Sequence, residues 1–439
     1  MKNIELLSPA KNLHCGIEAV KHGADAVYIG APRFGARVAA GNSWEDLEKL
    51  VRFAHLYSAK VHVTLNTILT DAELEEARNM AWRCYEMGVD ALIIQDMGLL
   101  RADLPPIALH ASTQADNRMP EKVKFLQEVG FQRVILAREL SLSQIKAIRQ
   151  ATEVELEAFV HGALCVSYSG QCYMSYAGCG RSANRGECAQ YCRLPYTLRD
   201  AEGRVLQQER HLLSLKDMNR SGSLREMIEA GITSFKIEGR LKEADYVKNI
   251  TLYYRRKLDA LLEGKPEPDG KNGADNCSDA VWAKASAGKV TAFFEPHPEK
   301  SFNRGFTEYF LHGRRGDEHQ WATPKSMGEP LGKVIGVTPK FFQLQTEKTL
   351  HNGDGLCFLD ERRQLVGFRL NRVEANRLFP LEMPDGLQKG VMLYRNEDRL
   401  FSKQLEGETA VRKIAVSLLF GETEKGFSLT MTDEEGCRV

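Results

Sequence analysis

The chain has 439 residues, of which 43% are hydrophobic and 27% charged, so it can bury a large core and does not resemble a disordered protein. Its 59 basic and 59 acidic residues cancel, which gives no sign of a general attraction to nucleic acid or membrane. No apolar run approaches the roughly 18 residues that span a bilayer, and the N-terminus lacks the features of a signal peptide. We therefore expect a cytoplasmic protein without a membrane partner.

Short apolar or β-branched runs alternate with amphipathic segments of helical length over the first 264 residues. This alternation indicates βα units and a parallel sheet. One helical segment, 43–59, begins with Ser43 as N-cap and Asp46 three positions later, so oxygen acceptors lie near the first backbone amides. The predicted strands are 4–10, 26–31, 60–66, 91–96, 107–113, 133–138, 154–162 and 234–240.

Eight strands with crossovers in about 250 residues fit a (β/α)8 TIM-like barrel, which we predict over 1–264. The segment between the seventh and eighth strands is then a cysteine-rich insertion at 163–196. A doubly wound sheet is the alternative fold. That fold usually has fewer strands per domain and often a glycine-rich first turn, which the segment "SPAKNLHCG" does not supply.

The composition changes after residue 264. Residues 265–300 are predicted to be a linker, because this part of the chain is rich in Gly, Pro, Asp and Asn. Short apolar runs around the turn "HNGDGL" predict a small β-barrel-like module at 301–400. Residues 401–439 are predicted to be the start of a further β region that stops as it begins, as a truncated chain would.

The last predicted barrel strand carries the motif "KIEGR". Lys236, Glu238 and Arg240 alternate in it, so their side chains lie on one face of the strand. Three charges on one strand face are costly in a core unless they are paired or lie at a ligand site. We predict that Lys236 and Arg240, with Arg138 from the sixth strand, bind an anionic cosubstrate or a phosphate. Glu238 is a candidate for proton transfer.

Two further candidates for proton transfer follow from the position of active sites in this fold, at the carboxyl ends of the strands. Asp96 ends the fourth strand, and His110 lies in "HASTQ" on the fifth. A carboxylate or an imidazole within reach of a substrate can act as general acid or base. Strand-end residues also cap helices and hold loops, so some of these candidates are expected to be structural only.

The insertion holds five of the ten cysteines of the chain, spaced Cys165-x6-Cys172-x15-Cys188-x3-Cys192, with Cys179 inside the long gap. Cytoplasmic thiols stay reduced, so this cluster indicates metal binding or catalysis more than disulfides. Zinc sites favour short cysteine pairs, and only the last pair fits that rule. Iron–sulfur clusters need four thiolates and tolerate varied spacing. The residues alone favour an iron–sulfur cluster and leave zinc or no metal as alternatives.

Several motifs in the chain resemble the collagenase-like peptidase family U-32. They are "ELLSPA", "GADAVYIG", "ARELSL", "FVHGALCVSYSGQC", "RGECAQYCR" and "KIEGR". The resemblance covers essentially all of 4–264 and continues into 302–310. Despite the family's name, its better-understood bacterial members resemble oxygen-independent hydroxylation enzymes that act on a 23S ribosomal RNA cytidine, on wobble uridine of tRNA, or in ubiquinone synthesis.

The resemblance implies a 4Fe–4S cluster held by Cys165, Cys172, Cys188 and Cys192, whereas Cys179 has no clear counterpart. It also implies prephenate as the source of oxygen in the RNA branch. The segment "GRSANRGECAQYCRLPY" looks more like the ribosomal RNA branch than the tRNA branch. The expected function is therefore hydroxylation of a pyrimidine in RNA, with a 23S cytidine at C5 as the first choice.

Two other classes of function remain as hypotheses. A peptidase is suggested by the family name, but neither an H-E-x-x-H nor a G-x-S-x-G motif occurs. The one suggestive thiol–imidazole pair is Cys165 with His161, four residues earlier. His161 is predicted instead to bind a substrate phosphate or to orient a metal ligand. The third hypothesis is a non-catalytic partner, because members of the ubiquinone branch act in pairs.

Overall fold

The predicted strands all form, and they close into one barrel. The computed structural model describes residues 2–35, 42–265, 282–434 and 436–439. Each barrel strand runs parallel to its neighbours, and the last one pairs with both the first and the seventh. The prediction of a (β/α)8 TIM-like barrel is therefore confirmed. The barrel strands are β1 (Lys2–Ala10), β2 (Ala26–Gly30), β3 (Lys60–Leu65), β4 (Ala91–Ile94), β5 (Ala108–Ala111), β6 (Arg133–Ile135), β7 (Glu155–Gly162) and β11 (Ile232–Ile237).

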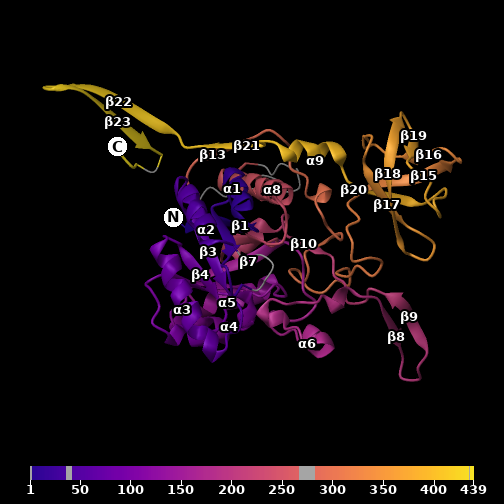
Figure 1. Cartoon of the computed structure of the whole chain (residues 1–439), viewed down its shortest axis with the longest axis horizontal. Coiled ribbons are helices and arrows are strands. Elements are labelled where there is room, and N and C mark those ends of the chain that lie inside the picture. Colours follow the sequence, from indigo (N-terminus) through magenta and orange to yellow (C-terminus); the bar gives the residue numbers. More distant parts are fainter. Residues whose placement is uncertain (1, 36–41, 266–281, 435) are drawn as a thin grey trace.

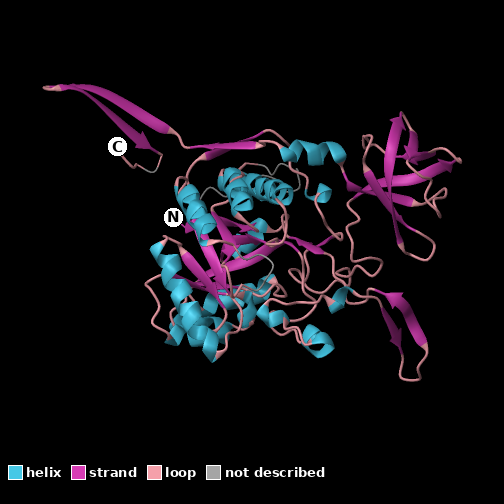
Figure 2. Cartoon of the chain, viewed as in Figure 1, coloured by secondary structure: helices cyan, strands magenta, loops and turns pink. Residues whose placement is uncertain are grey.

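Helices surround these strands (Figures 1 and 2). Helix α2 (Trp44–His55) begins as predicted, because the amide N–H of Asp46 donates to the Oγ of Ser43 at 3.2 Å. Between β4 and β5 the chain forms only the short 3-10 helix η2 (Met97–Arg101). None of the described helices is long and apolar enough to cross a membrane. The other helices of the barrel are α1 (Leu13–Lys21), α3 (Asp71–Glu86), α4 (Pro120–Glu128), α5 (Leu142–Ala151), α7 (Leu224–Glu229) and α8 (Ala244–Leu262).

Strand alternation gives the barrel two separate cores. Ile4 and Leu6 of β1 belong to the main hydrophobic cluster, which lies between the strands and the helices. Leu7 belongs to a smaller cluster that also contains Tyr28 and Phe159. This inner cluster packs the barrel interior with side chains, as is usual for the fold, and it forms the floor on which a site at the carboxyl ends can be built.

The cysteine-rich insertion is longer and more structured than its sequence suggested. It contains the short helix α6 (Met174–Cys179) and the 3-10 helices η4 (Ala183–Arg185) and η5 (Tyr191–Arg193). A hairpin of β8 (Tyr196–Arg199) and β9 (Val205–Arg210) follows and projects from the body (Figure 1). The sequence analysis did not predict this hairpin, because its solvent-exposed strands lack the apolar alternation of a half-buried sheet.

The prediction of a linker over 265–300 needs correction. Residues 266–281 lie outside the described part of the chain, but the residues that follow are built into the barrel. Strand β12 (Trp282–Lys284) pairs with β1, and β13 (Lys289–Ala292) pairs with a strand near the C-terminus. Strand β10 (Asp217–Asn219), which precedes β11 in the chain, extends the main sheet beyond β7. After the 3-10 helix η6 (Pro298–Lys300), strand β14 (Phe306–Thr307) pairs with β10.

The β-rich module is a closed six-stranded barrel that starts later than its predicted boundary of 301. Its order is β15-β16-β19-β18-β17-β20, and it lies to one side of the larger barrel (Figure 1). A small apolar cluster that includes Phe342 and Phe358 fills its interior. Its strands are β15 (Glu329–Val337), β16 (Phe342–Gln345), β17 (Gly355–Leu359), β18 (Leu365–Glu374), β19 (Arg377–Pro380) and β20 (Met392–Glu397).

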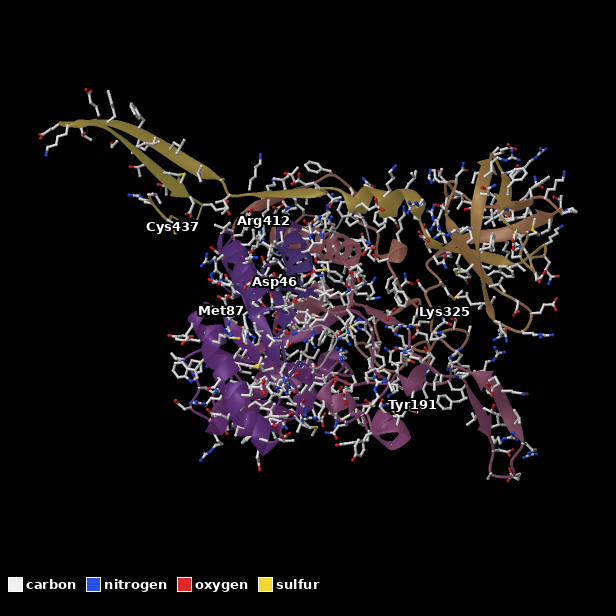
Figure 3. All side chains as sticks on the ribbon, viewed as in Figure 1. Asp46, Met87, Tyr191, Lys325, Arg412 and Cys437 are labelled. Atoms are coloured by element: carbon white, nitrogen blue, oxygen red, sulfur yellow. The ribbon has the colours of Figure 1, made fainter. Side chains whose placement is uncertain are left out.

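After the module the chain returns to the larger barrel through α9 (Arg399–Glu406) and β21 (Ala410–Lys413), the strand that pairs with β13. Arg412 anchors this return (Figure 3), since its guanidinium donates to the carbonyls of Val20 and Ala24 at 3.0 and 2.9 Å. Beyond β21 the chain forms a hairpin within the β region predicted at 401–439. Its strands β22 (Val416–Thr423) and β23 (Gly426–Asp433) pair only with each other and project from the body (Figure 2).

Candidate active site

A cavity of about 70 Å³ lies at the carboxyl ends of the barrel strands, where this fold places active sites. Four of the residues predicted from the sequence line it, namely Arg138, Lys236, Glu238 and Arg240. The cavity is small, so a polymer could present only one of its groups to it. The remaining lining residues are Tyr28, Thr64, Asn66, Ile93, Ser112, Thr113, Gln114, Ile135 and Phe159.

Two arginines border the cavity, and each has a partner. The guanidinium of Arg138 lies 2.5 Å from the carboxylate of Glu238 and 4.0 Å from the ring centroid of Phe159. Arg240 is buried and donates to the hydroxyl of Thr64. Arg240 and Glu238, which follow the last barrel strand, therefore line the same cavity. Arg138 reaches the same cavity from the end of β6.

Lys236 points into the barrel beneath these arginines. Its Nζ donates to Glu157 at 2.7 Å and lies 4.3 Å from the ring centroid of Tyr28. Burial lowers the pKa of Lys236, and the charge of Glu157 and its hydrogen bond oppose that shift. Lys236 is thus both a wall of the cavity and one end of an internal ion pair, a pairing that the sequence analysis did not predict.

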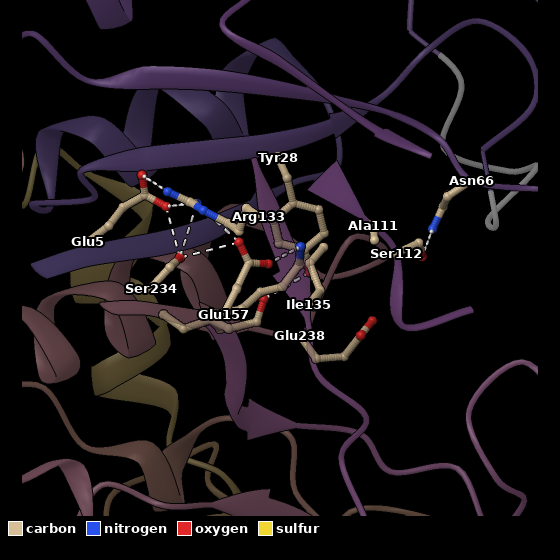
Figure 4. A network of polar contacts seen from close by, with 12 residues as sticks. Glu5, Tyr28, Asn66, Ala111, Ser112, Arg133, Ile135, Glu157, Ser234 and Glu238 are labelled. Atoms are coloured by element: carbon tan, nitrogen blue, oxygen red, sulfur yellow. Dashed lines mark hydrogen bonds and ion pairs between the residues drawn. The ribbon is translucent and has the colours of Figure 1, made fainter. Parts of the chain in front are cut away.

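Glu157 continues the ion pair into a network inside the barrel (Figure 4). Arg133 of β6 lies 3.2 Å from Glu157 and also binds both carboxylate oxygens of Glu5, the second at 3.1 Å. Ser234 donates to Glu5 at 2.8 Å. Burial alone would raise the pKa of Glu5, but the charge and hydrogen bonds of Arg133 outweigh it and lower that pKa to about 2. The charges thereby compensate each other where water is excluded.

Asp96 does not lie at the cavity. It caps η2, and its two carboxylate oxygens accept from the amide N–H groups of Gly98 and Leu69, each at 2.8 Å. A carboxylate held in this way orders a helix start and the neighbouring loop. The structure therefore assigns Asp96 a structural position, and the prediction of a role in proton transfer has no geometric support.

The two predicted histidines are buried below or beside the cavity rather than in its lining. His110 packs edge-on against His62, with ring centroids 4.7 Å apart, and burial lowers its pKa well below the ordinary value. His161 lies against Tyr254, whose hydroxyl is 3.3 Å from its Nδ1, and burial lowers the pKa of His161 to about 3. Both rings are neutral at physiological pH, and neither reaches the cavity directly.

The sequence analysis missed Thr64, Glu157 and Arg133, which position the predicted cations. A usable signal existed for Glu157, because this carboxylate interrupts the apolar run of β7 on the face that strand alternation turns inward. A lone charge inside an otherwise buried strand predicts a partner of opposite charge on a neighbouring strand. Thr64 offered no comparable signal, since threonine is common in strands for reasons of propensity alone.

The four predicted metal ligands gather in the cysteine-rich insertion. Burial raises the pKa of the Cys192 thiol, and the charges of Cys165, Cys188 and Cys172 act on the same thiol and raise it further. Cys179 is not among these neighbours. Its thiol instead donates to the carbonyl of Ser175 at 3.3 Å.

The spacing of these thiols can be compared with the needs of a metal. Four sulfurs on one zinc ion would lie about 3.8 Å apart, given Zn–S bonds of about 2.3 Å. Over the residues that the structure describes, no three of the insertion's thiols lie within 4.8 Å of one another. The described thiols are therefore not arranged as a closed site for a single ion.

Arginines fix the insertion to the barrel. Arg185 lies 2.7 Å from Glu73 of α3, and Arg193 donates to the carbonyl of Leu215 in the inner cluster at 2.8 Å. Gly170 packs directly on the backbone of Gln114, where an added Cβ would lie 2.0 Å from the carbonyl oxygen. The insertion thus lies against the cavity wall, because Gln114 lines the cavity from the other side.

Comparisons with known proteins agree with this geometry. The model of the family described as peptidase family U32 matches residues 11–321. The 23S rRNA 5-hydroxycytidine C2501 synthase of Escherichia coli (strain K12) is 50% identical over 99% of this chain and 66% of its own length. The chain therefore spans slightly less than two thirds of that relative.

Two further relatives carry different names. An uncharacterized protease of Methanocaldococcus jannaschii is 38% identical over 60% of this chain and 67% of its own length. The tRNA hydroxylation protein P1 of Bacillus subtilis (strain 168) is 35% identical over 68% of this chain and 72% of its own length. The insertion and every barrel strand except β1 fall within the residues that the family model matches.

Proposed function

The chain belongs to peptidase family U32, and on that premise we propose that it is a cytoplasmic RNA-modifying enzyme that hydroxylates a cytidine of 23S ribosomal RNA at C5. The observation that carries this proposal is the 50% identity, over 99% of the chain, to a relative named for that product. A second relative is named for tRNA hydroxylation, but its identity is 35%. Ribosomal RNA is therefore the first choice of substrate.

The lining of the cavity offers the kinds of group that contact one base extruded from an RNA strand. Enzymes that modify bases bind them out of the stack, between apolar walls and hydrogen-bonding groups. Tyr28 and Phe159 supply aromatic walls here. Asn66 donates to the hydroxyl of Ser112 at 3.1 Å, so both polar side chains are held in place at the cavity edge (Figure 4). Amide and hydroxyl groups of this kind can recognise the edge of a pyrimidine.

The charges of the cavity suit an anionic cosubstrate as well. The lining includes three cations and one carboxylate, Glu238, while Glu157 lies behind Lys236. A small dicarboxylate such as prephenate could pair with Arg240 and Arg138, since guanidinium groups bind carboxylates in a fork geometry. Glu238 would then be displaced from Arg138 and could accept the proton that leaves the base.

The insertion is proposed to hold a 4Fe–4S cluster on Cys165, Cys172, Cys188 and Cys192. All four thiols are free and lie in one insertion beside the cavity, which supports that ligand set, whereas the thiol of Cys179 has the carbonyl of Ser175 as its partner. Such a cluster, when bound, supplies electron transfer. The protein's part is to fix the insertion against the cavity wall, which Gly170 and the arginine contacts do.

A cysteine peptidase is poorly supported by the same geometry. Activation of a thiol needs a base within hydrogen-bonding reach. The thiol of Cys165 has the hydroxyl of Ser167 as its partner at 3.2 Å, and His161 is buried against Tyr254. Throughout the described residues, no cysteine has a histidine as its hydrogen-bonding partner.

The test is complementation of an E. coli strain that lacks its own 23S cytidine hydroxylation enzyme. The gene for this chain should restore 5-hydroxycytidine in 23S ribosomal RNA, measured by mass spectrometry of nucleosides. Arg240→Ala should abolish the product while the protein stays folded and keeps its iron. Absence of the product with folded, iron-loaded protein would overturn the proposal. A product in tRNA alone would overturn the choice of ribosomal RNA.

A further inference from the structure

A second cavity, of about 410 Å³, lies beside the barrel mouth, between the insertion and the segment that follows β14. The two cavities share a wall. Arg138 lines the first and its chain neighbour Glu139 lines the second. On the other side of the wall, Gly170 packs against Gln114 of the first cavity, and Gln171 lines the second. A ligand that occupied both cavities would therefore need to cross only this shared wall.

Aromatic rings form the walls of this second cavity. Tyr309 and Phe310 stack with centroids 3.9 Å apart and planes 17° apart. Tyr168 of the insertion is 52% exposed. The guanidinium of Arg118 lies 3.9 Å from the centroid of the Tyr168 ring and holds one of its faces. Exposed aromatic rings held by arginines are the surfaces on which single-stranded nucleic acids stack their bases.

The wall is fixed by an unusual backbone conformation. Tyr309 has a φ of 58°, in the left-handed region that bulky side chains rarely adopt. Its N–H donates to the hydroxyl of Thr307 at 3.0 Å, and its side chain is buried. Conformations of this kind persist where the surrounding structure determines them, and they are concentrated at ligand sites. The aromatic wall is therefore formed before any ligand arrives.

The second cavity has one cation that can contact a phosphate, Arg314, beside two carboxylates. Glu139 accepts from the N–H and the hydroxyl of Ser169, both at 3.0 Å. Glu318 accepts from the N–H of Arg315 at 3.0 Å. These neutral donors hold both carboxylates in place without cancelling their charge. Arg314 lies over the Phe310 ring at 4.9 Å and, within the described parts of the chain, forms no ion pair.

We propose that the second cavity binds the nucleobase next to the target base, in a single-stranded stretch of the RNA substrate. The base would stack on Tyr168 or Phe310, with its phosphate near Arg314. This inference rests on the proposed function, since it assumes RNA at the barrel mouth. The volume of about 410 Å³ falls within the roughly 300–1,000 Å³ of small-molecule sites, which is enough for one base. Stacking is tolerant of base identity, so this site would set affinity and register.

The test uses the full chain with its iron and a fluorescein-labelled single-stranded RNA that contains the target cytidine. Two further oligomers carry an abasic nucleotide on the 5′ or the 3′ side of that cytidine. Tyr168→Ala should weaken binding of the intact oligomer by about 5- to 150-fold in fluorescence anisotropy, the usual effect of losing one stacked base. One of the two abasic oligomers lacks the base that stacks on Tyr168. That oligomer should bind the wild type and the Tyr168→Ala variant with equal affinity.

Tyr176→Ala is the matched control, because Tyr176 lies in the same insertion, is 62% exposed and does not line the cavity. It should change binding by less than about 2-fold. Tyr168→Phe should keep the wild-type affinity, and iron content and circular dichroism should show that every variant is folded. Phe310→Ala provides a second test of the same wall.

The inference is overturned if Tyr168→Ala and Phe310→Ala both bind the intact oligomer as the wild type does. It is also overturned if they lose the same factor on all three oligomers, which would indicate a contact with the RNA backbone or with another ligand. Failure of the proposed function looks different: the variants would still weaken binding, but no hydroxylated cytidine would be formed by the wild type.

Discussion

The barrel interior and the cysteine-rich insertion both concentrate chemically active side chains, but they hold them in opposite ways. Glu5, Arg133, Glu157 and Lys236 lie on strands, are at most 5% exposed, and satisfy one another. The insertion's cysteines lie in loops and short helices, and Cys165, Cys179 and Cys188 are exposed. The interior charges are paired with one another, whereas four thiols of the insertion are the proposed ligands of a cluster.

This difference separates two kinds of function. A charge on a buried strand cannot be removed without leaving its partner uncompensated, so the interior network should control stability and the placement of Lys236. A thiol on an exposed loop can be removed at little cost to the fold. Its loss should affect only the ligand that it holds. Four experiments sharpen or break this contrast, and they are given in order of decreasing effect.

The largest effect is expected for the cysteines of the insertion. Cys165→Ala, Cys172→Ala, Cys188→Ala or Cys192→Ala should each remove most of the iron from anaerobically purified protein and abolish hydroxylation. Cys179→Ala is the control, because its thiol has a separate partner, and it should keep both. Iron per chain and absorption near 400 nm measure the outcome. Stoichiometric zinc without iron in the wild type would contradict the ligand assignment.

In the barrel interior, Glu157→Gln should lower the free energy of unfolding by about 3–5 kcal/mol. It leaves Arg133 and Lys236 buried without their shared carboxylate. Glu155→Gln should cost less than about 1 kcal/mol, because Glu155 also contacts Arg133 but its side chain is 59% exposed. Urea unfolding measures both variants. Equal losses of unfolding free energy in the two variants would show that the interior network stabilises the protein no more than a surface ion pair does.

Acid should destabilise the protein through its buried histidines. The pKa of His161 is about 3 in the folded chain, below its ordinary value of 6.5. Between pH 3 and pH 6.5 its imidazole therefore binds a proton in the unfolded chain only. Stability should therefore be complete above about pH 6.5 and fall toward pH 3, by up to about 1.4 kcal/mol per pH unit for each such histidine.

His161→Gln should make that fall shallower by the contribution of one histidine, measured as urea midpoints between pH 7 and 5. His14→Gln, at an exposed position, should follow the wild-type curve. The carboxylate of Glu5 acts in a lower window. Its pKa of about 2 is below the ordinary 4.5, so its contribution is present above pH 4.5 and is lost as the pH falls further. An unchanged slope for His161→Gln would contradict its buried, neutral state.

The smallest effect on stability is expected at the C-terminal hairpin. One face of β22–β23 carries Leu418, Phe420, Phe427 and Leu429, each more than 60% exposed. Apolar strand faces of this kind favour association. Phe420→Ser with Leu429→Ser should reduce self-association in light scattering and change unfolding of the barrel by less than about 0.5 kcal/mol.

Leu419→Ser is the control for that experiment, because Leu419 is equally exposed but lies on the opposite face of the hairpin, with serine and threonine neighbours. It should leave association nearly unchanged. If both changes reduce association to the same extent, total exposed apolar area matters rather than the continuous apolar face. If neither does, the hairpin is not the site of self-association.

Much of the larger barrel was predictable from the sequence. Strands buried on both faces are apolar throughout, and their alternation with amphipathic helices is a local property of the chain. Even the start of α2 at Ser43 followed from its capping residues. The strands β12 and β13 were not predictable, because they are short, and β12 forms only by pairing with the edge that β1 offers it. The linker prediction failed for that reason.

The candidate site also has a part that the sequence predicts and a part that it does not. The sequence by itself determined which residues are charged on the last strand, how the cysteines are spaced, and that both lie at one end of a barrel, because strand alternation and chain order fix these properties. Only the tertiary structure decided that Asp96 caps a helix, that Lys236 pairs with Glu157 from another strand, and that Tyr168 lines one cavity with Tyr309 and Phe310. Those contacts join residues far apart in the chain, so closure of the barrel and docking of the insertion establish them.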